Sequence, residues 1–293
     1  MRLIEAIEQA SARLQSAGVS FGQGTTNAFD EAAWLTLWRM GLPLDGLDEN
    51  ALRVLKPQEL AQVNDLISQR ISSRQPAAYL TGEAWLQGVA FTVDARVIVP
   101  RSLIAEPLVA GSFDAWLGPH TRRVLDLCTG NGSLAVLAAM AWPDVRVDAT
   151  DLSADALAVA RINIERHALA DRIHLLQGDG LDAVVGQRYD LIVCNPPYVN
   201  SQSMATLPAE FRAEPELALD GGSDGMSFIR GLLQRLPDHM TEEAILILEI
   251  GHERVHFERA FPRLGVVWLT SSAGDDQVLL ATRAELAVAA NSL

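Results

Sequence analysis

The tetrapeptide Asn195-Pro196-Pro197-Tyr198 combines residue types that can hold a planar amino group. It follows the apolar run 189–194, which predicts a buried strand. Consecutive prolines cannot donate hydrogen bonds to a sheet, so this strand must end there. The asparagine amide, the proline carbonyl and the tyrosine ring are therefore held on a stiff backbone at the carboxyl end of a strand, where ligands bind in open α/β sheets. We interpret this site as one that binds an amino nitrogen and makes it nucleophilic.

A second set of residues predicts a nucleotide site. The segment 124–133 indicates a strand, a turn built on Gly130 and Gly132, and the start of a helix whose free N–H groups suit an anion. Asp151 ends the next strand about twenty residues on, where a carboxylate can accept both hydroxyls of a ribose. Gly178-Asp179-Gly180 closes the third strand, where an adenine edge could be read. A plain turn at either glycine segment, or a helix cap at Asp151 or Ser153, is the structural alternative.

The nucleotide could be NAD or S-adenosylmethionine. The turn Gly130-Asn131-Gly132 lacks the third glycine of the dinucleotide fingerprint, which argues against NAD. The Asn-Pro-Pro-Tyr site favours methyl transfer to nitrogen, and so favours S-adenosylmethionine.

These residues need a sheet to position them. Strand–helix alternation after residue 122 predicts an α/β fold with a mostly parallel sheet of seven strands and helices on both faces. The predicted strands are 123–128, 145–150, 172–177, 189–194, 244–250, 264–270 and 277–282, and the predicted helices are 132–141, 153–168 and 226–237.

The first third of the chain predicts helices. Asn27 with Asp30 resembles a capping box, and Pro57 suits the first turn of a later helix. We interpret the stripe of Trp34 and Trp38 as core rather than as a ligand site.

These patterns divide the chain into three predicted parts. A helical domain is predicted over 1–75, a β-hairpin linker around Gly88 over 76–101, and the α/β domain over 102–293. Ser102 is predicted to cap a helix that runs to about residue 117.

The bulk composition narrows the function classes. The hydrophobic content of 49% supports a packed core, and the sequence predicts neither a membrane span nor a signal peptide. Cys128 and Cys194 are the only cysteines, which favours buried thiols and a cytoplasmic location, and the histidine spacing predicts no metal site. The net charge of −14 argues against direct DNA binding and favours a basic protein partner. The alternative is that the acidic charge serves solubility alone.

The order of glycine turn, acidic ribose residue and Asn-Pro-Pro-Tyr resembles the class I S-adenosylmethionine-dependent amino-methyltransferases, which have a Rossmann-like sheet. The chain is more closely similar to the protein glutamine-N5 methyltransferases, which add a small helical N-terminal domain; the resemblance implies that residues 1–75 recognise the substrate. Within them it resembles the branch that modifies ribosomal protein L3. The supporting stretches are 21–27, 78–81, 99–102 and 126–130. Cys128 stands where release-factor enzymes usually have glycine, and Asn131 replaces the more usual serine or threonine.

The resemblance implies which residues act. The cofactor, S-adenosylmethionine, would contact Asp126, Cys128, Thr129, Gly130, Asn131, Gly132, Asp151, Leu152, Asp179, Gly180 and Asn195. The substrate would contact Asn195, Pro196, Pro197 and Tyr198. In our hypothesis the Asn195 side-chain oxygen and the Pro196 carbonyl accept hydrogen bonds from a glutamine amide, and Tyr198 packs on the amide plane. The implied partner is a basic ribosomal protein.

Further residues and rival functions stay open. Two roles are open for Arg101, orienting a loop beside the cofactor or forming a surface ion pair, and two for Glu249, binding substrate or capping Gly251. Glu214 and Glu216 are expected to be solvated loop charges. The rival functions are a release-factor glutamine methyltransferase, a DNA adenine methyltransferase that flips its base, and a non-catalytic ribosome-assembly factor.

Overall fold

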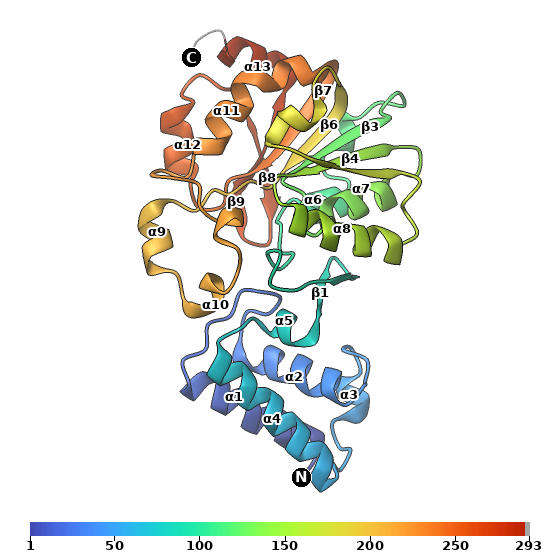
Figure 1. The fold of residues 1–293 in the computed structure, drawn as a ribbon, viewed down its shortest axis with the longest axis vertical. Helices are drawn as coiled ribbons and strands as arrows, with labels where there is room; N and C mark the ends of the chain where they lie inside the picture. The colour runs from blue at the N-terminus through green and yellow to red at the C-terminus, as the bar shows by residue number, and fades with distance from the viewer. Residues whose placement is uncertain (291–293) are drawn as a thin grey trace.

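The computed structural model describes residues 1–290 and places a helical N-terminal part at one end and an α/β part at the other (Figure 1). The N-terminal helices are α1 (Leu3–Ser16), α2 (Ala28–Arg39), α3 (Leu47–Asn50), α4 (Pro57–Ser73) and α5 (Ala77–Thr81). The predicted caps are confirmed: Asn27 Oδ1 accepts from Asp30 N at 2.9 Å, and Pro57 opens α4. No helix of residues 1–290 is long and apolar enough to cross a membrane.

The α/β part is built on one seven-stranded sheet of order β5-β4-β3-β6-β7-β9-β8. Its strands are β3 (Arg123–Leu127), β4 (Arg146–Asp151), β5 (Ile173–Gln177), β6 (Tyr189–Cys194), β7 (Met240–Glu249), β8 (Val267–Ser271) and β9 (Gly274–Thr282). β9 runs antiparallel to both neighbours, and the other pairs are parallel, so the predicted mostly parallel sheet is confirmed.

Helices cover both faces of the sheet. The helices are α6 (Ala105–Val109), α7 (Ser133–Ala141), α8 (Ala154–Arg166), α11 (Ser227–Arg235), α12 (Arg254–Ala260) and α13 (Arg283–Ala290). Side chains alternate along β3, so Val124 joins the core under α6, α7 and α8, while Leu125 and Leu127 join the core under α11 and α12. The strand order reverses between β3 and β6, where doubly wound sheets form a ligand crevice.

The segment between the two parts differs in detail from the sequence prediction. The hairpin is present as β1 (Glu83–Leu86) and β2 (Val89–Thr92), with Gln87 and Gly88 both at positive φ as a two-residue turn requires. The single helix predicted from Ser102 to about 117 is wrong. Only α6 and a short 3-10 turn form, because Gly111 at φ +66° ends the helix.

The division into 1–75, 76–101 and 102–293 stays a prediction. The 76–101 segment holds α5 as well as the hairpin. The N-terminal core also continues into the α/β part, because Ala156 and Val159 of α8 belong to the same buried cluster as Leu3, Leu35 and Ile67.

The chain between β6 and α11 crosses from the sheet toward the N-terminal helices (Figure 1). This segment, residues 199–222, contains α9 (Ser201–Thr206), α10 (Ala209–Arg212) and a 3-10 turn at 216–218. We call it the strap.

Candidate active site

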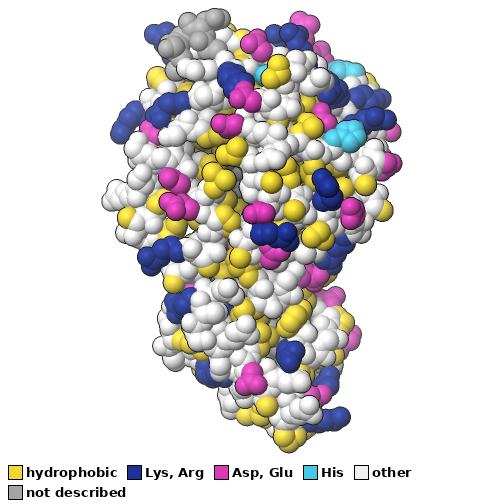
Figure 2. Space-filling model, viewed as in Figure 1, with side chains coloured by type: hydrophobic (Ala, Val, Ile, Leu, Met, Phe, Trp, Pro, Cys, Tyr) yellow, Lys and Arg dark blue, Asp and Glu magenta, His cyan; other side chains and the backbone are white. Residues whose placement is uncertain are grey.

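A cavity of about 740 Å³ lies at the carboxyl ends of the central strands. Its walls come from the sheet edge, the strap, the segment 96–103 and the loop 21–27. Figure 2 shows hydrophobic side chains gathered down the centre of the face seen there, from the α/β part toward the N-terminal part. Most of the residues predicted from the sequence line the cavity: Cys128, Thr129, Gly130, Asn131, Asp151, Leu152, Asp179, Gly180, Asn195, Pro197 and Tyr198.

Asp126, Gly132 and Pro196 are the predicted site residues that do not line the cavity. Gly132 has a packing role: a Cβ there would lie 3.2 Å from Ala160 Cβ, so the glycine lets α7 approach α8. Pro196 is buried at the end of β6.

Asp126 holds the loop that follows β3. It is fully buried, and its Oδ2 accepts hydrogen bonds from Thr129 Oγ1 at 2.5 Å and Ala135 N at 3.0 Å. Burial raises the pKa of Asp126 to about 7, although both hydrogen bonds act in the opposite direction. Asp126 therefore fixes the glycine turn from behind the cavity wall.

Asp151 occupies the wall itself. Its Oδ2 accepts from Gly130 N and its Oδ1 from Ser153 N, both at 2.9 Å. Ser153, not Asp151, caps α8, because its hydroxyl accepts from Ala156 N. Burial raises the pKa of Asp151, and the backbone N–H groups act against that shift.

Tyr198 is held rigidly at the cavity. Its hydroxyl donates to Glu249 Oε1 at 2.9 Å, and a Cβ added to Gly251 would lie 2.4 Å from Tyr198 Cε2. Burial and the Glu249 carboxylate both raise the pKa of Tyr198, so the phenol stays protonated. The half-buried side chain of Asn195 makes no hydrogen bond within residues 1–290, so its amide is free to bind a ligand.

Glu249 is the centre of the polar contacts behind Tyr198. Its Oε2 accepts from Ser102 Oγ at 2.6 Å and from Leu103 N at 2.9 Å. The carboxylate is 2% exposed, and burial raises its pKa while the three donors oppose the shift. The sequence pointed to Glu249 only as the end of a strand and did not reveal Ser102 as its partner.

Arg101 and Glu214 form an ion pair that closes one side of the cavity. Arg101 Nη1 and Nη2 donate to the two Glu214 oxygens at 2.7 and 2.8 Å, and the guanidinium lies 5.4 Å from the Phe211 ring centre. Val99 N also donates to Glu214. The interpretation of Glu214 as a solvated charge is wrong, since it is 4% exposed; Glu216 is exposed as expected.

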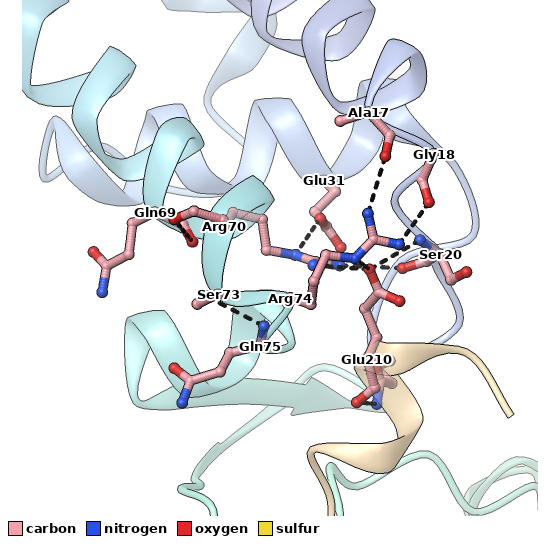
Figure 3. A network of polar contacts seen from close by, with 12 residues as sticks. Ala17, Gly18, Ser20, Glu31, Gln69, Arg70, Ser73, Arg74, Gln75 and Glu210 are labelled. Carbon is pink, nitrogen blue, oxygen red and sulfur yellow. Dashed lines mark hydrogen bonds and ion pairs between the residues drawn. The ribbon is translucent and has the colours of Figure 1, made fainter.

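A buried ion network fastens the strap to the N-terminal helices (Figure 3). Arg70 of α4 donates to Glu31 of α2 at 2.9 Å and pairs with Glu210 of the strap at 3.4 Å. Arg74 Nε also reaches Glu210, at 2.8 Å. Gln23 Nε2 donates to the Glu210 backbone carbonyl. This network could not be predicted from the sequence, because its contacts join residues that are 39 to 187 positions apart.

Known proteins of similar sequence identify the family. The family model for the methyltransferase small domain matches residues 108–222. A ribosomal protein uL3 glutamine methyltransferase of Bordetella pertussis is 50% identical over 97% of this chain and 96% of its own length. One of the same name from Burkholderia pseudomallei is 47% identical over 96% and 94%. The chain belongs to the ribosomal protein uL3 glutamine methyltransferase family. It is an enzyme that uses S-adenosylmethionine.

Solved structures agree on the fold of this methyltransferase family member. A crystal structure of the hMettl16 catalytic domain with the MAT2A 3'UTR hairpin 6 superposes with a TM-score of 0.51 at 16% identity. The match covers 78% of this chain and 81% of that one. At this identity the likeness concerns the fold alone.

The cavity fits the cofactor of a methyltransferase. A Cβ built on Gly130 would meet no atom within 4 Å, so the turn opens onto free space. Asn131 lines the cavity, and its Nδ2 is buried without a hydrogen-bond partner in residues 1–290, as expected where a polar ligand completes the site. Leu152 is 49% exposed at the wall, which suits packing against a ribose or an aromatic base.

Proposed function

We propose that this chain transfers a methyl group from S-adenosylmethionine to the side-chain amide nitrogen of a glutamine in ribosomal protein uL3. The relatives at 44–50% identity over nearly the whole chain carry this activity in their names, which supports the proposal. The observation that carries the chemistry is the free amide of Asn195 beside a rigidly held Tyr198. The reaction on this substrate would take place in the cytoplasm.

The cofactor would lie along the strand ends. We assign the wall residues Asp151, Leu152, Asp179 and Gly180 to its nucleoside, and the turn 128–131 to its amino-acid part. Asp151 would accept from the ribose hydroxyls, because its carboxylate is fixed by backbone N–H groups at the cavity wall. When bound, S-adenosylmethionine supplies an electrophilic methyl group on sulfur.

Asn195 and Pro196 would hold the substrate amide. A glutamine amide nitrogen is a poor nucleophile, because its lone pair is delocalised into the carbonyl. Hydrogen bonds from its NH₂ to the Asn195 side-chain oxygen and the Pro196 carbonyl would orient the nitrogen and favour its pyramidal form. Positioning of this kind can contribute roughly 7–11 kcal/mol to lowering a barrier.

Tyr198 would form a flat wall for the substrate amide. Its hydroxyl is already occupied by Glu249, so the ring is positioned before substrate arrives. With its pKa raised, Tyr198 is a poor proton acceptor or donor at neutral pH, and we assign it no acid–base role. The methylated nitrogen is strongly acidic while cationic, so its proton can pass to solvent without a dedicated base.

A comparison of acceptors tests the proposal. The purified enzyme is incubated with methyl-labelled S-adenosylmethionine and, separately, with uL3, peptide-chain release factors and duplex DNA. We expect label in uL3 alone. Label in release factors only would show that the substrate is a release factor and not uL3. Label in DNA only would contradict amide methylation altogether, and no label in any acceptor would support a non-catalytic role.

A further inference from the structure

A second cavity of about 750 Å³ lies in the N-terminal part, outside the active site. Trp34 and Trp38 of α2 and Trp85 of β1 line it, together with the loop 41–45. We call it the tryptophan cavity. The prediction that Trp34 and Trp38 belong to the core is confirmed, since Trp34 is buried in the N-terminal core and the half-buried Trp38 packs against it. Both also present a surface to this cavity, and Trp85 is 45% exposed.

One short loop separates the tryptophan cavity from the active site. In the loop 21–27, Gly22 and Thr26 line the active-site cavity, while Gly24 and Thr25 line the tryptophan cavity. Gly24 has φ +107°, and a Cβ there would lie 3.1 Å from Trp34 Cζ3, so the loop packs closely on the indole. A polypeptide bound in the active site can therefore reach the tryptophan cavity with neighbouring residues.

The charged residues that line the tryptophan cavity are both acidic. Asp45 and Glu83 line it, and no lysine or arginine does. Asp45 is exposed and has no ion pair or hydrogen bond within residues 1–290. Glu83 accepts from Trp85 Nε1 at 3.2 Å and pairs with Arg166 at 2.6 Å, which orients the indole.

The three indoles also have no cationic partner of their own. The arginine–ring contacts in residues 1–290 involve Phe211, Tyr189 and Trp268, and none involves Trp34, Trp38 or Trp85. Tryptophan is the ring that attracts a cation most strongly, and it does so best where the cation is partly removed from water. An open indole-lined cavity with a free carboxylate is thus complementary to a basic side chain.

We propose that the tryptophan cavity binds a lysine or arginine side chain of the protein substrate, close in sequence to the glutamine that enters the active site. This rests on the proposed function, because the substrate is taken to be a basic ribosomal protein. The net charge of −14 favours such a partner over an acidic or neutral one. The cavity would then contribute to substrate affinity and take no part in the chemistry.

Two variants with matched controls test the inference. Trp85→Ala removes an exposed indole from the cavity, and Asp45→Asn removes the free carboxylate without changing side-chain size. Trp116→Ala and Asp48→Asn make the same changes at exposed positions that line neither cavity. Steady-state methylation of full-length uL3 is measured for each, with the dissociation constant for S-adenosylmethionine and the melting temperature.

We expect both cavity variants to raise KM for uL3 roughly three- to tenfold, with kcat and cofactor affinity unchanged. The two control variants should match the wild type. If Trp85→Ala raises KM and Asp45→Asn does not, the cavity takes an apolar side chain and the assignment of a basic one is overturned. If neither variant changes KM while the wild type methylates uL3, the cavity is no substrate site although the proposed function stands. If the wild-type enzyme fails to methylate uL3, the proposed function itself is contradicted, and uL3 is not the source of the side chain.

Discussion

Asn195 and Tyr198 lie three residues apart in the sequence, but only one of the two side chains is held in place by the protein. Tyr198 is fixed by Glu249 and by contact with Gly251, whereas the Asn195 amide has no protein partner within residues 1–290. A group that must bind and reorient a substrate is expected to be free in the protein alone, and its supporting wall is expected to be rigid. At the residue scale, Asn195 is therefore the group whose loss should affect chemistry most.

Asn195→Ala should lower kcat by at least about 100-fold, because the substrate nitrogen loses the acceptor that orients it. The dissociation constant for S-adenosylmethionine should stay within a few-fold of the wild-type value. Single-turnover methylation of uL3 and calorimetric cofactor titration measure the two quantities. Near-normal turnover in a folded variant would remove Asn195 from the mechanism.

The raised pKa of Asp126 predicts that the stability of the protein depends on pH. Its pKa is raised to about 7 by burial, so the folded protein keeps this proton to a higher pH than the unfolded chain does. The resulting stabilisation is complete below the unfolded pKa near 3.8 and is lost as the pH rises to about 7.

Asp126→Asn should flatten this profile, since the amide does not titrate. The wild-type free energy of unfolding should fall relative to that of the variant by no more than about 4 kcal/mol between pH 4 and 7. Urea titrations of both proteins across this range provide the measurement. Parallel profiles for the two proteins would show that Asp126 is already ionised in the fold.

At the scale of elements, the strap is held by two buried glutamates that form three ion pairs. Glu210 joins Arg70 and Arg74 of the N-terminal part, and Glu214 joins Arg101 beside the hairpin. Both glutamates are at most 4% exposed, so each anchor is removed from water and has a fixed geometry. The strap contributes one wall of the active-site cavity, so the N-terminal helices help to set the shape of that cavity.

Arg70→Met should destabilise the protein by about 3–5 kcal/mol, because it leaves Glu31 buried without a cation and Glu210 with Arg74 alone. The triple variant Arg70→Met, Glu31→Gln, Glu210→Gln should recover part of this loss, since it removes the unpaired charges. Denaturant unfolding of the single and triple variants measures both effects. Equal stability of the wild type and Arg70→Met would mean that the network does not hold the strap.

The helices and strands that could be predicted are those marked by residues close together in the sequence. Strand periodicity located all seven strands, and cap residues such as Asn27 and Pro57 marked the helix starts. The start of β7 at Met240 was missed, because Glu242 and Glu243 break the apolar pattern that begins at 244. The buried pairs could not be predicted, because a charge pair distant in sequence leaves no periodic trace and its burial depends on how the parts meet.

At the scale of the whole molecule, the acidic net charge is expected to affect association with the substrate. The net charge of −14 creates a long-range field that attracts a basic partner and weakens as salt screens it.

Salt should therefore act on substrate capture. Raising the ionic strength from about 0.05 to about 0.3 M should increase KM for uL3 several-fold, while cofactor affinity changes little. Methylation kinetics over a sodium chloride series measure this, with a neutral osmolyte as the control for crowding. An unchanged KM would indicate that shape, not charge, selects the substrate.

The central claim is that the Asn195 site methylates a glutamine side-chain amide in uL3. Tandem mass spectrometry of uL3 after incubation with S-adenosylmethionine and the enzyme tests it most directly. The account predicts a single methyl group on the side-chain nitrogen of one glutamine with the wild-type enzyme, and none with Asn195→Ala. A methyl group on any other type of residue, or the same modified glutamine produced by Asn195→Ala, would contradict it.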